Sequence, residues 1–416
     1  MWARVKLKID WSDILFTLFA ARRGGDVDAL QTALEHYWSP DGEAIACFSV
    51  RSGFDLLLQA MMARGELTEG DEVMFSALNV KQMVRAVERL GLVPVPVELD
   101  LSDMSPRMDS AARALTDRSK LFVVAHLFGA RIDLGPAAEF ARQHGLLLVE
   151  DCAQAYDGPM NRGSPLADVA MFSFGPIKTK TCLGGGLLIV RDGALLTEMR
   201  RIQAEYEVQT DKDQAKRALK FAGLKLVTSR PVFWLLDKFF RLRGQSYDEG
   251  VSNAVRDVAK QKTPKQLRKR CSASLLRLLL RRLRQDVAPE LGERIRLGDK
   301  MRDLVGDTAL LPAIGACYHD YWVFAAIVEN PAETIEALRR KGFDACDLPR
   351  SEAIAPPEDR EDLRAVVAEK TLTNLIVLPC YPEMPDRAIE AEAAAFRAVA
   401  KQPLMPEPLA RAEAAE

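Results

Sequence analysis

Short apolar runs alternate with helix-length amphipathic stretches between about residue 46 and residue 204. Short apolar runs are typical of buried strands, and strands that alternate with helices favour a parallel or mixed sheet covered on both faces. From about residue 285 the pattern predicts a long helix at 290–305, then a strand, a helix and a final amphipathic helix. The sequence therefore predicts an α/β protein with a mixed, mostly parallel sheet in a large domain and a small α+β domain after it.

The changes of pattern divide the chain into five segments. They are an N-terminal arm (1–45), a large domain (46–204), a basic amphipathic helical insert (205–284), a small C-terminal domain (285–405) and an acidic tail (406–416). The arm contains an amphipathic stretch at 9–19, which either packs on the rest of the protein or lies at an interface. We expect the tail to fray.

The composition is that of an ordinary soluble globular protein. The 416 residues include 57 basic and 59 acidic side chains, and 48% of them are hydrophobic, which allows a large core in two or three domains. The seven cysteines are scattered without a C-x-x-C pair, and the four histidines are not clustered. We therefore expect no metal site, no disulfide framework and a cytoplasmic location. No apolar run reaches the roughly 18 residues of a spanning helix, and a signal-peptide layout is missing.

The predicted insert is locally basic although the whole chain is close to neutral. Residues 216–243 hold eight basic side chains and one acidic one among many apolar residues, and residues 265–284 hold eight basic side chains and no acid. These helices either pack on the core or across a dimer interface, as amphipathic helices usually do, or they lie peripherally on the anionic inner face of a membrane. Nucleic acid is not an expected partner, because no recognition motif accompanies the charge.

Two carboxylates follow the apolar run at 146–149. Glu150 and Asp151 then lie at the carboxyl end of a buried strand, where open α/β sheets place their ligands. A carboxylate there can keep a pyridine nitrogen protonated, and a cationic pyridine draws electrons from a substrate carbon far better than a neutral one. Asp151 is the candidate for this role. Gln154 either reaches the same ring or makes ordinary hydrogen bonds to backbone.

A lysine follows the next apolar run, at 171–174, after a Gly-Pro break. A lysine on a loop at a sheet edge is desolvated, which lowers its pKa toward the amine form that a Schiff base requires. Lys178 is the candidate. The alternatives are an ordinary solvated lysine, or Lys180, which would point the other way in an extended loop.

Two nearby features are suited to a phosphate group. Ser173 offers a hydroxyl, and the glycines at 184–186 let backbone come close to a cofactor or to the strand that follows. Three glycines alone are a weak signal. Together with Asp151 and Lys178, however, these are the parts of a pyridoxal phosphate site.

The order of these residues resembles a family signature, E-D-x-A-Q-A-x-G followed by D, F-S-F, Lys and a glycine-rich turn. It is similar to that of the DegT-type (DegT/DnrJ/StrS) sugar aminotransferases, which are fold type I pyridoxal phosphate enzymes. The matching residues are Glu150, Asp151, Ala153, Gln154, Ala155, Gly158, Asp168, Phe172, Ser173, Phe174 and Lys178. The similarity is strong from about 47 to 190 and patchy from about 268 to the end.

This resemblance implies a cofactor, a site and a reaction. It implies a homodimer that binds pyridoxal 5'-phosphate, with Lys178 and Asp151 as catalytic residues and a phosphate held at a helix N-terminus. The implied cofactor-binding residues are Ser52, Gly53, Phe54, Asp151, Gln154, Ser173 and Lys178. The implied reaction moves an amino group from an amino acid such as glutamate to a keto sugar, nucleotide sugar or related acceptor, including a lipid-linked one.

Two other classes of function stay open. A pyridoxal-dependent lyase would share every cofactor residue, whereas a non-catalytic regulatory homologue would not need Lys178, Asp151 and Ser173 together. Some relatives replace the lysine by histidine and act as dehydratases, and Lys178 argues against that branch.

The chain also departs from the family pattern. Phe54 stands where a Thr or Ser usually follows the phosphate-loop glycine, and Val80 stands where an aromatic side chain usually stacks on the pyridine ring. Arg268 occupies the place of an Asn that reaches the neighbouring subunit's cofactor, and 347–350 replace an aromatic, His-rich substrate loop. The identity of the acceptor is therefore left open.

Overall fold

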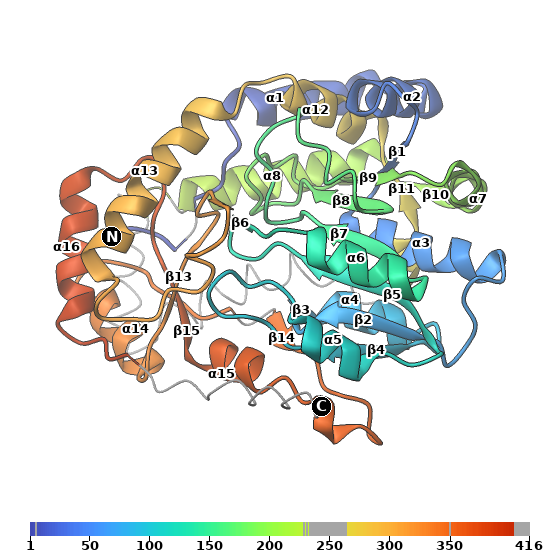
Figure 1. Ribbon diagram of the computed structural model, residues 1–416. Coiled ribbons are helices and arrows are strands. Elements are labelled where there is room, and N and C mark those ends of the chain that lie inside the picture. Colours follow the sequence, from blue (N-terminus) through green and yellow to red (C-terminus); the bar gives the residue numbers. More distant parts are fainter. Residues whose placement is uncertain (5, 228, 230–231, 233–263, 349–350, 403–416) are drawn as a thin grey trace, which may run out of the picture.

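The computed structural model describes residues 1–4, 6–227, 229, 232, 264–348 and 351–402. Seven strands form one central sheet in the order β1-β9-β8-β7-β5-β2-β4 (Figure 1). Their bounds are β1 Ala44–Cys47, β2 Glu72–Ser76, β4 Val93–Val97, β5 Ser119–Ala125, β7 Leu147–Asp151, β8 Val169–Ser173 and β9 Gly186–Val190.

Most neighbouring strands of this sheet run in parallel. The run β8-β7-β5-β2-β4 is parallel, β9 is antiparallel to β8, and β1 is antiparallel to β9. The predicted α/β class is thus confirmed, and the apolar runs at 146–149 and 171–174 correspond to β7 and β8. Nearly every position of these strands is buried, which is why they read as continuous apolar runs.

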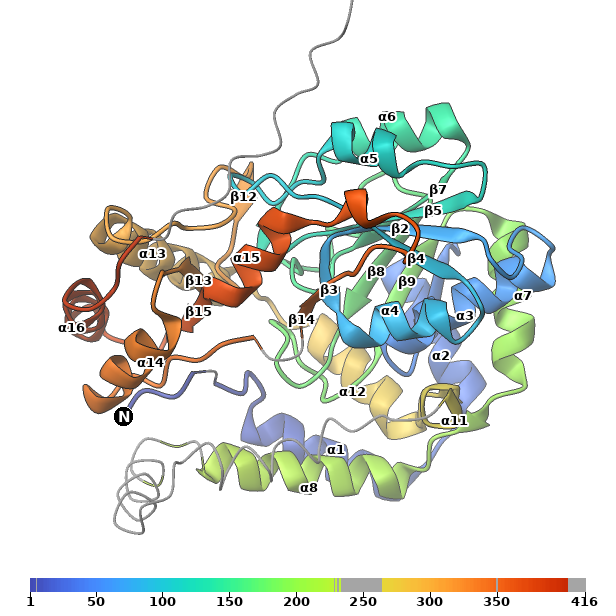
Figure 2. The same ribbon diagram turned by 90° about the horizontal axis from the view of Figure 1, so that it is seen from below.

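Helices cover both faces of the sheet. On one face lie α3 Val50–Ala63, α4 Lys81–Glu88 and α7 Gly193–Ala204. On the other face lie α5 Met108–Ala114 and α6 Gly135–His144 over one half, and α2 Val27–Trp38 and α12 Ala273–Leu283 over the other half. Outside α12, α1 Trp11–Arg23 and α8 Asp211–Val227 run side by side (Figure 2).

The arm and the insert both contribute to this core. The face of α1 that carries Ile14 and Ala20 packs on the protein, and β1 begins at Ala44, before the predicted end of the arm. The leucines of α12 are buried except Leu280, which is partly buried, so the packing interpretation holds for 273–283. Of the residues at 216–243, positions 228, 230–231 and 233–243 lie outside the described residues. Short elements β10 Glu207–Val208, α11 Pro264–Leu267 and β11 Lys269–Arg270 complete this region.

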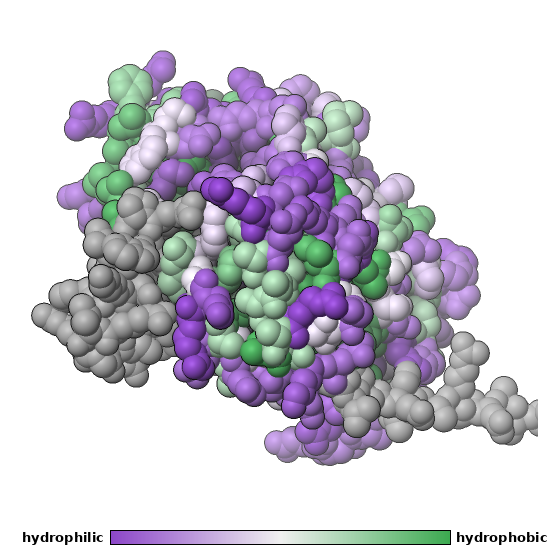
Figure 3. Space-filling model, turned by 90° about the vertical axis from the view of Figure 1, so that its left-hand side faces the viewer, coloured by the Kyte–Doolittle hydropathy of each residue, from purple (hydrophilic) through white to green (hydrophobic). Residues whose placement is uncertain are grey.

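The small domain has its own core. The antiparallel pair β13 Phe324–Ile327 and β15 Leu375–Leu378 packs with α13 Ala288–Val305, α14 Pro331–Arg340 and α16 Asp386–Arg397. The helix α13 confirms the long helix predicted at 290–305. Figure 3 shows this end of the molecule, where hydrophilic side chains surround smaller apolar areas.

Several contacts join the small domain to the large one. The strands β6 Ala130–Arg131 and β12 Tyr318–His319 pair with each other, as do β3 Leu78–Val80 and β14 Ser351–Ala353. The 3-10 helix Glu361–Leu363 and α15 Val366–Asn374 follow on the same side. Among the described helices, none has the length and apolar content needed to cross a membrane.

Candidate active site

Asp151 is the last residue of β7 and is buried at the carboxyl edge of the sheet. Its Oδ1 accepts a hydrogen bond of 2.9 Å from the backbone N–H of Ala153. Burial raises the pKa of this carboxyl, while the Ala153 N–H and the positive charge of Lys178 act in the opposite direction. A cation placed against Asp151 would favour its ionised form.

Lys178 follows β8 and faces this carboxylate. Burial lowers the pKa of Lys178 to about 8, against the opposing charge of Asp151 and with a smaller contribution from Arg51. Its Nζ lies 4.4 Å from the centre of the Trp322 ring, and the Trp322 Nε1–H donates a 3.0 Å bond to Ile177 O. The lysine is thus held beside a carboxylate and under an indole, with its amine form accessible near neutral pH.

Lys180 points elsewhere. It is buried, its Nζ donates to Asp286 O at 3.3 Å, and burial followed by the nearby charge of Arg282 lowers its pKa. Of the two lysines weighed from the sequence, only Lys178 is positioned next to Asp151.

A helix N-terminus lies beside these residues. Ser49 caps α3, its Oγ accepting from Ser52 N at 3.1 Å and lying 2.9 Å from Ser52 Oγ. A Cβ on Gly186 would come within 2.6 Å of Val50 N, so this position of the glycine run requires glycine for the sheet to meet α3. The first turn of α3 presents serine hydroxyls and the positive end of the helix dipole, an arrangement suited to a phosphate.

The next two residues of α3 serve packing instead. The N–H of Gly53 donates to Ser49 O at 3.0 Å, and a Cβ there would lie 2.4 Å from Leu188 Cδ1. Phe54 is fully buried in the core, edge-to-face with Phe75 at 6.0 Å. Helical geometry turns the Phe54 side chain by roughly 100° per residue away from the first turn and into the sheet. The prediction that Phe54 takes part in cofactor binding stays a prediction.

Ser173 and Gln154 have different surroundings. Ser173 ends β8 and is partly exposed. A Cβ added at Gly175 would lie within 4 Å of both Ser173 Oγ and Lys178 Cγ, so these two side chains border the same space. The Gln154 Oε1 accepts from Phe128 N at 2.8 Å. Gln154 therefore makes the backbone bond weighed as its alternative role, and it fixes Phe128, which has a φ of 61°.

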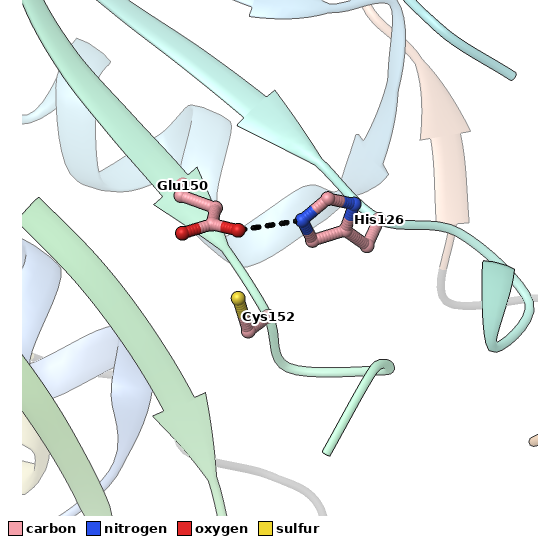
Figure 4. A group of neighbouring side chains, drawn as sticks. All are labelled: His126, Glu150 and Cys152. Carbon is pink, nitrogen blue, oxygen red and sulfur yellow. Dashed lines mark hydrogen bonds and ion pairs between the residues drawn. The ribbon is translucent and has the colours of Figure 1, made fainter. Parts of the chain in front are cut away.

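His126, Glu150 and Cys152 form a buried cluster (Figure 4), with ligand atoms within 4.8 Å of one another. The His126 Nε2 lies 2.8 Å from Glu150 Oε1, and Glu150 Oε2 accepts from Ser164 N at 2.6 Å. The His126 Nδ1 accepts from Ile132 N at 3.3 Å. Because both ring nitrogens and both carboxylate oxygens are already engaged, we interpret the cluster as a hydrogen-bond network that supports β7.

Two of the departures from the family pattern take structural roles. Val80 is partly buried in β3 and pairs with Ser351 of β14. Arg268 donates from Nε to Asp55 Oδ2 at 2.9 Å within its own chain. The sequence singled out neither Ser49 nor Arg51, and it took Trp322 only as part of a strand. Their positions depend on contacts between segments far apart in the chain.

Solved structures share this fold over nearly the whole chain. The sugar aminotransferase CalS13 from Micromonospora echinospora superimposes with a TM-score of 0.69 at 15% identity, over 96% of this chain and 100% of that one. The E. coli GDP-4-keto-6-deoxy-D-mannose-3-dehydratase, solved with bound hydrated PLP, gives 0.67 at 13% identity, over 95% and 99%. At these identities the likeness shows the fold alone, which is that of the fold type I transferases.

The profile of the DegT/DnrJ/EryC1/StrS aminotransferase family matches residues 13–226, and the chain belongs to that family. The erythromycin biosynthesis sensory transduction protein EryC1 of Saccharopolyspora erythraea is 37% identical over 163 residues, 38% of this chain and 43% of that protein. The UDP-N-acetyl-3-dehydro-alpha-D-glucosamine 3-aminotransferase of Acidithiobacillus ferrooxidans is 32% identical over 163 residues, 38% and 44%. The chain thus matches less than half the length of these curated relatives.

Proposed function

We propose that the protein is a pyridoxal phosphate-dependent aminotransferase that moves an amino group from an amino acid, with glutamate as the first candidate, to a keto sugar or nucleotide sugar. The observation that carries the proposal is the closeness of Lys178 to Asp151 at the carboxyl edge of the sheet, where each charge influences the other and burial lowers the pKa of Lys178 to about 8. Family membership and the named activities of the relatives support the reaction class.

The residues present fit this cofactor. Asp151 is a buried carboxylate whose ionised form a cationic partner would favour, as a protonated pyridine nitrogen would be. Ser173, Ser49 and Ser52 offer hydroxyls, the last two at the start of α3, where a phosphate would be held. Bound there, the cofactor would supply an electron sink for the carbon that gains or loses the amino group.

The chain's own residues would then orient the reactants and move protons. With a pKa near 8, a substantial fraction of Lys178 is uncharged at neutral to mildly basic pH and can accept a proton from a substrate carbon and return it. The ring of Trp322 lies over Nζ and covers one side of it. Asp151 would hold the positive charge of a protonated pyridine nitrogen, and the hydrogen bond from Ala153 fixes the orientation of its carboxylate.

The experiment compares Lys178→Ala with Lys180→Ala. We expect the wild type to bind pyridoxal phosphate with a visible absorption band that borohydride bleaches, leaving the label on Lys178. Lys178→Ala should lose the band and at least about 10²-fold to 10⁴-fold of the amino-transfer rate, whereas Lys180→Ala should keep the band. The reverse pattern would show that the site has been assigned to the wrong lysine.

A pyridoxal-dependent lyase remains the second candidate, because the same fold also serves a dehydratase. A half-reaction separates the two. Under our proposal, glutamate converts the cofactor to its amine form with release of 2-oxoglutarate, and a keto sugar then reverses the change. Release of ammonia or of a fragment of the substrate carbon chain would favour the lyase.

We further propose that the protein is a cytoplasmic homodimer. Its seven free cysteines agree with a reducing compartment, and the family resemblance supports the dimer, with 268–272 near the contact. We also propose that α1 and α8 touch an anionic membrane peripherally. The support is that α1 exposes Trp11, Leu15 and Phe19 while α8 exposes Leu219 and Leu226.

A further inference from the structure

The segment ahead of α1 alternates basic and apolar residues. Arg4, Lys6 and Lys8 occur at every second position, and of the described residues between and beside them Ala3, Leu7 and Ile9 are buried. Side chains two positions apart in an extended chain point to the same side. One side of this segment is therefore anchored in the core while the other carries a row of positive charge.

Backbone and side-chain contacts fix the segment on the small domain. The Trp2 N–H donates to Gly342 O at 2.7 Å, and Trp2 O accepts from Asp344 N at 2.9 Å. Arg4 donates to the same Asp344 through Nε at 2.9 Å and through NH2 at 2.7 Å. The basic row is thus held in a defined place.

That place is the wall of a pocket that also contains Lys178. The pocket, of about 440 Å³ including its open mouth, lies between the N-terminal segment, the Lys178 loop and the small domain. The cations that line it are Arg4, Lys6, Lys8, Lys178 and Arg294. Within the described residues no carboxylate lines the pocket, and Trp322 and Tyr381 belong to its less polar wall. Such a site favours a ligand with an anionic group attached to a larger body.

The two lysines differ from Arg294 in how firmly they are held. The buried Arg294 donates to Asp320 O at 2.6 Å and to Thr179 Oγ1 at 3.1 Å. Lys6 pairs with Glu383 at 2.9 Å, and both side chains are about two-fifths exposed. Lys8 pairs with Glu290 at 3.0 Å and with Glu383 at 3.3 Å, and its side chain is 13% exposed. Exposed ion pairs contribute little stability, so an anionic ligand can recruit Lys6 at small cost. Lys8 would bind such a ligand while keeping its two carboxylate partners.

We infer that Lys6 and Lys8 bind an anionic group of the substrate while its reacting carbon faces Lys178. This inference rests on the proposed function and names a determinant of specificity within it. A phosphate group on the acceptor and the distal carboxylate of an amino-acid donor share the required chemistry, because both accept charge-assisted hydrogen bonds from ammonium groups.

The test is calorimetric titration of the cofactor-loaded protein with inorganic pyrophosphate and, separately, with glutarate. The variant Lys6→Gln/Lys8→Gln is compared with Lys120→Gln/Lys401→Gln, which removes the same charge away from the pocket. We expect the wild type and the control to bind one of the two anions, and the Lys6/Lys8 variant to bind it about tenfold or more weakly. Binding of pyrophosphate assigns the pocket to the acceptor, and binding of glutarate assigns it to the donor.

Kinetics provides the second measurement. The Lys6/Lys8 variant should raise the KM of the one substrate whose anion binds, with kcat and the visible cofactor band little changed. Equal affinity of wild type and variant for the anion, or no anion binding at all, overturns the inference. If the cofactor band and the half-reaction with glutamate are still observed, the proposed function is unaffected. Loss of the band in the wild type would overturn the proposed function instead.

Discussion

Two helices of the basic segment between the domains, α8 and α12, are both rich in basic residues but have opposite surroundings. In α12 the leucines at 275, 276, 278, 279 and 283 are all buried. In α8 only Gln214, Ala218 and Phe221 are buried, and Leu219 and Leu226 are 58% and 55% exposed. The composition of a basic helix that contains leucines therefore does not decide whether the helix is exposed or buried. Exposure depends on how many faces of the helix are covered by other elements, and α12 is covered by the sheet and by α1.

The charges of the two helices differ in the same way. Arg282 of α12 is buried, donates from Nε to Thr181 O at 3.0 Å and pairs with Asp13 of α1 at 2.7 Å. Arg281 pairs with the same Asp13 at 2.8 Å. The exposed Lys216 and Lys220 of α8 lie on its outer side. An arginine can be buried in α12 because α1 supplies a carboxylate, and this is what fixes α1 on the protein.

The largest expected effect comes from removing that carboxylate. Asp13→Ala leaves Arg282 buried without its partner, which should lower the free energy of unfolding by about 3–5 kcal/mol. Glu139→Ala, which breaks an exposed pair with Arg142, is the matched control and should change it by no more than about 1 kcal/mol. Urea unfolding of the three proteins measures both. Equal effects would mean that α12 does not depend on α1.

The pH dependence of unfolding checks the same pair. Burial alone would raise the pKa of Asp13, but the hydrogen bonds and charges of Arg281 and Arg282 outweigh it and lower the pKa below 3.8. A lowered carboxyl pKa contributes stability that is complete above the unfolded-state value and is lost as the pH falls toward the folded-state value. Wild type should therefore lose more stability than Asp13→Asn between about pH 5 and pH 3.

Truncating one leucine in each helix should give the next largest difference. Leu279→Ala leaves a cavity beside Gly185, where its side chain now packs, and should cost about 2–5 kcal/mol. Leu219→Ala removes an exposed side chain and should change stability by about 0.5 kcal/mol or less. Thermal and urea unfolding compare the two. A large cost at Leu219 would show that a partner molecule covers α8 in solution.

Much of the fold follows from local pattern. The apolar runs that became β7 and β8 and the long helix α13 are buried on regular periods, so their type is fixed by their own residues. The sequence left the surroundings of α8 and α12 undecided for a physical reason. The periodicity of each helix indicates that one face is apolar, but it does not indicate whether another segment, here α1, covers the remaining side.

The site shows the same limit. Asp151 and Lys178 could be proposed from their places after two strands, and the structure brings them together. The side-chain direction of Phe54 and the bond that occupies Gln154 depend on the packing of α3 and on the loop at Phe128. Trp322 reaches Ile177 across 145 positions of sequence. Such long-range contacts produce no periodic pattern in the sequence, so they could not be predicted from it.

The smallest expected effect concerns the open side of α1. Trp11, Leu15 and Phe19 follow one another at every fourth position and are 44%, 64% and 66% exposed, near the basic end of α1 at Arg22 and Arg23. Such a stripe suits the surface of an anionic membrane, where each basic side chain adds about 1 kcal/mol that salt screens. We expect the wild type to float with anionic liposomes at low salt and to float less at high salt.

The variant Leu15→Ser/Phe19→Ser should lose that flotation, whereas Met160→Ser/Leu166→Ser, which alters two exposed apolar residues elsewhere, should keep it. Light scattering after size exclusion records the oligomeric state of each protein. A wild type that never floats would remove the membrane proposal. A Leu15/Phe19 variant that becomes monomeric would instead assign the stripe to the contact between subunits, because the same apolar side chains would then be covered by a second copy of the chain.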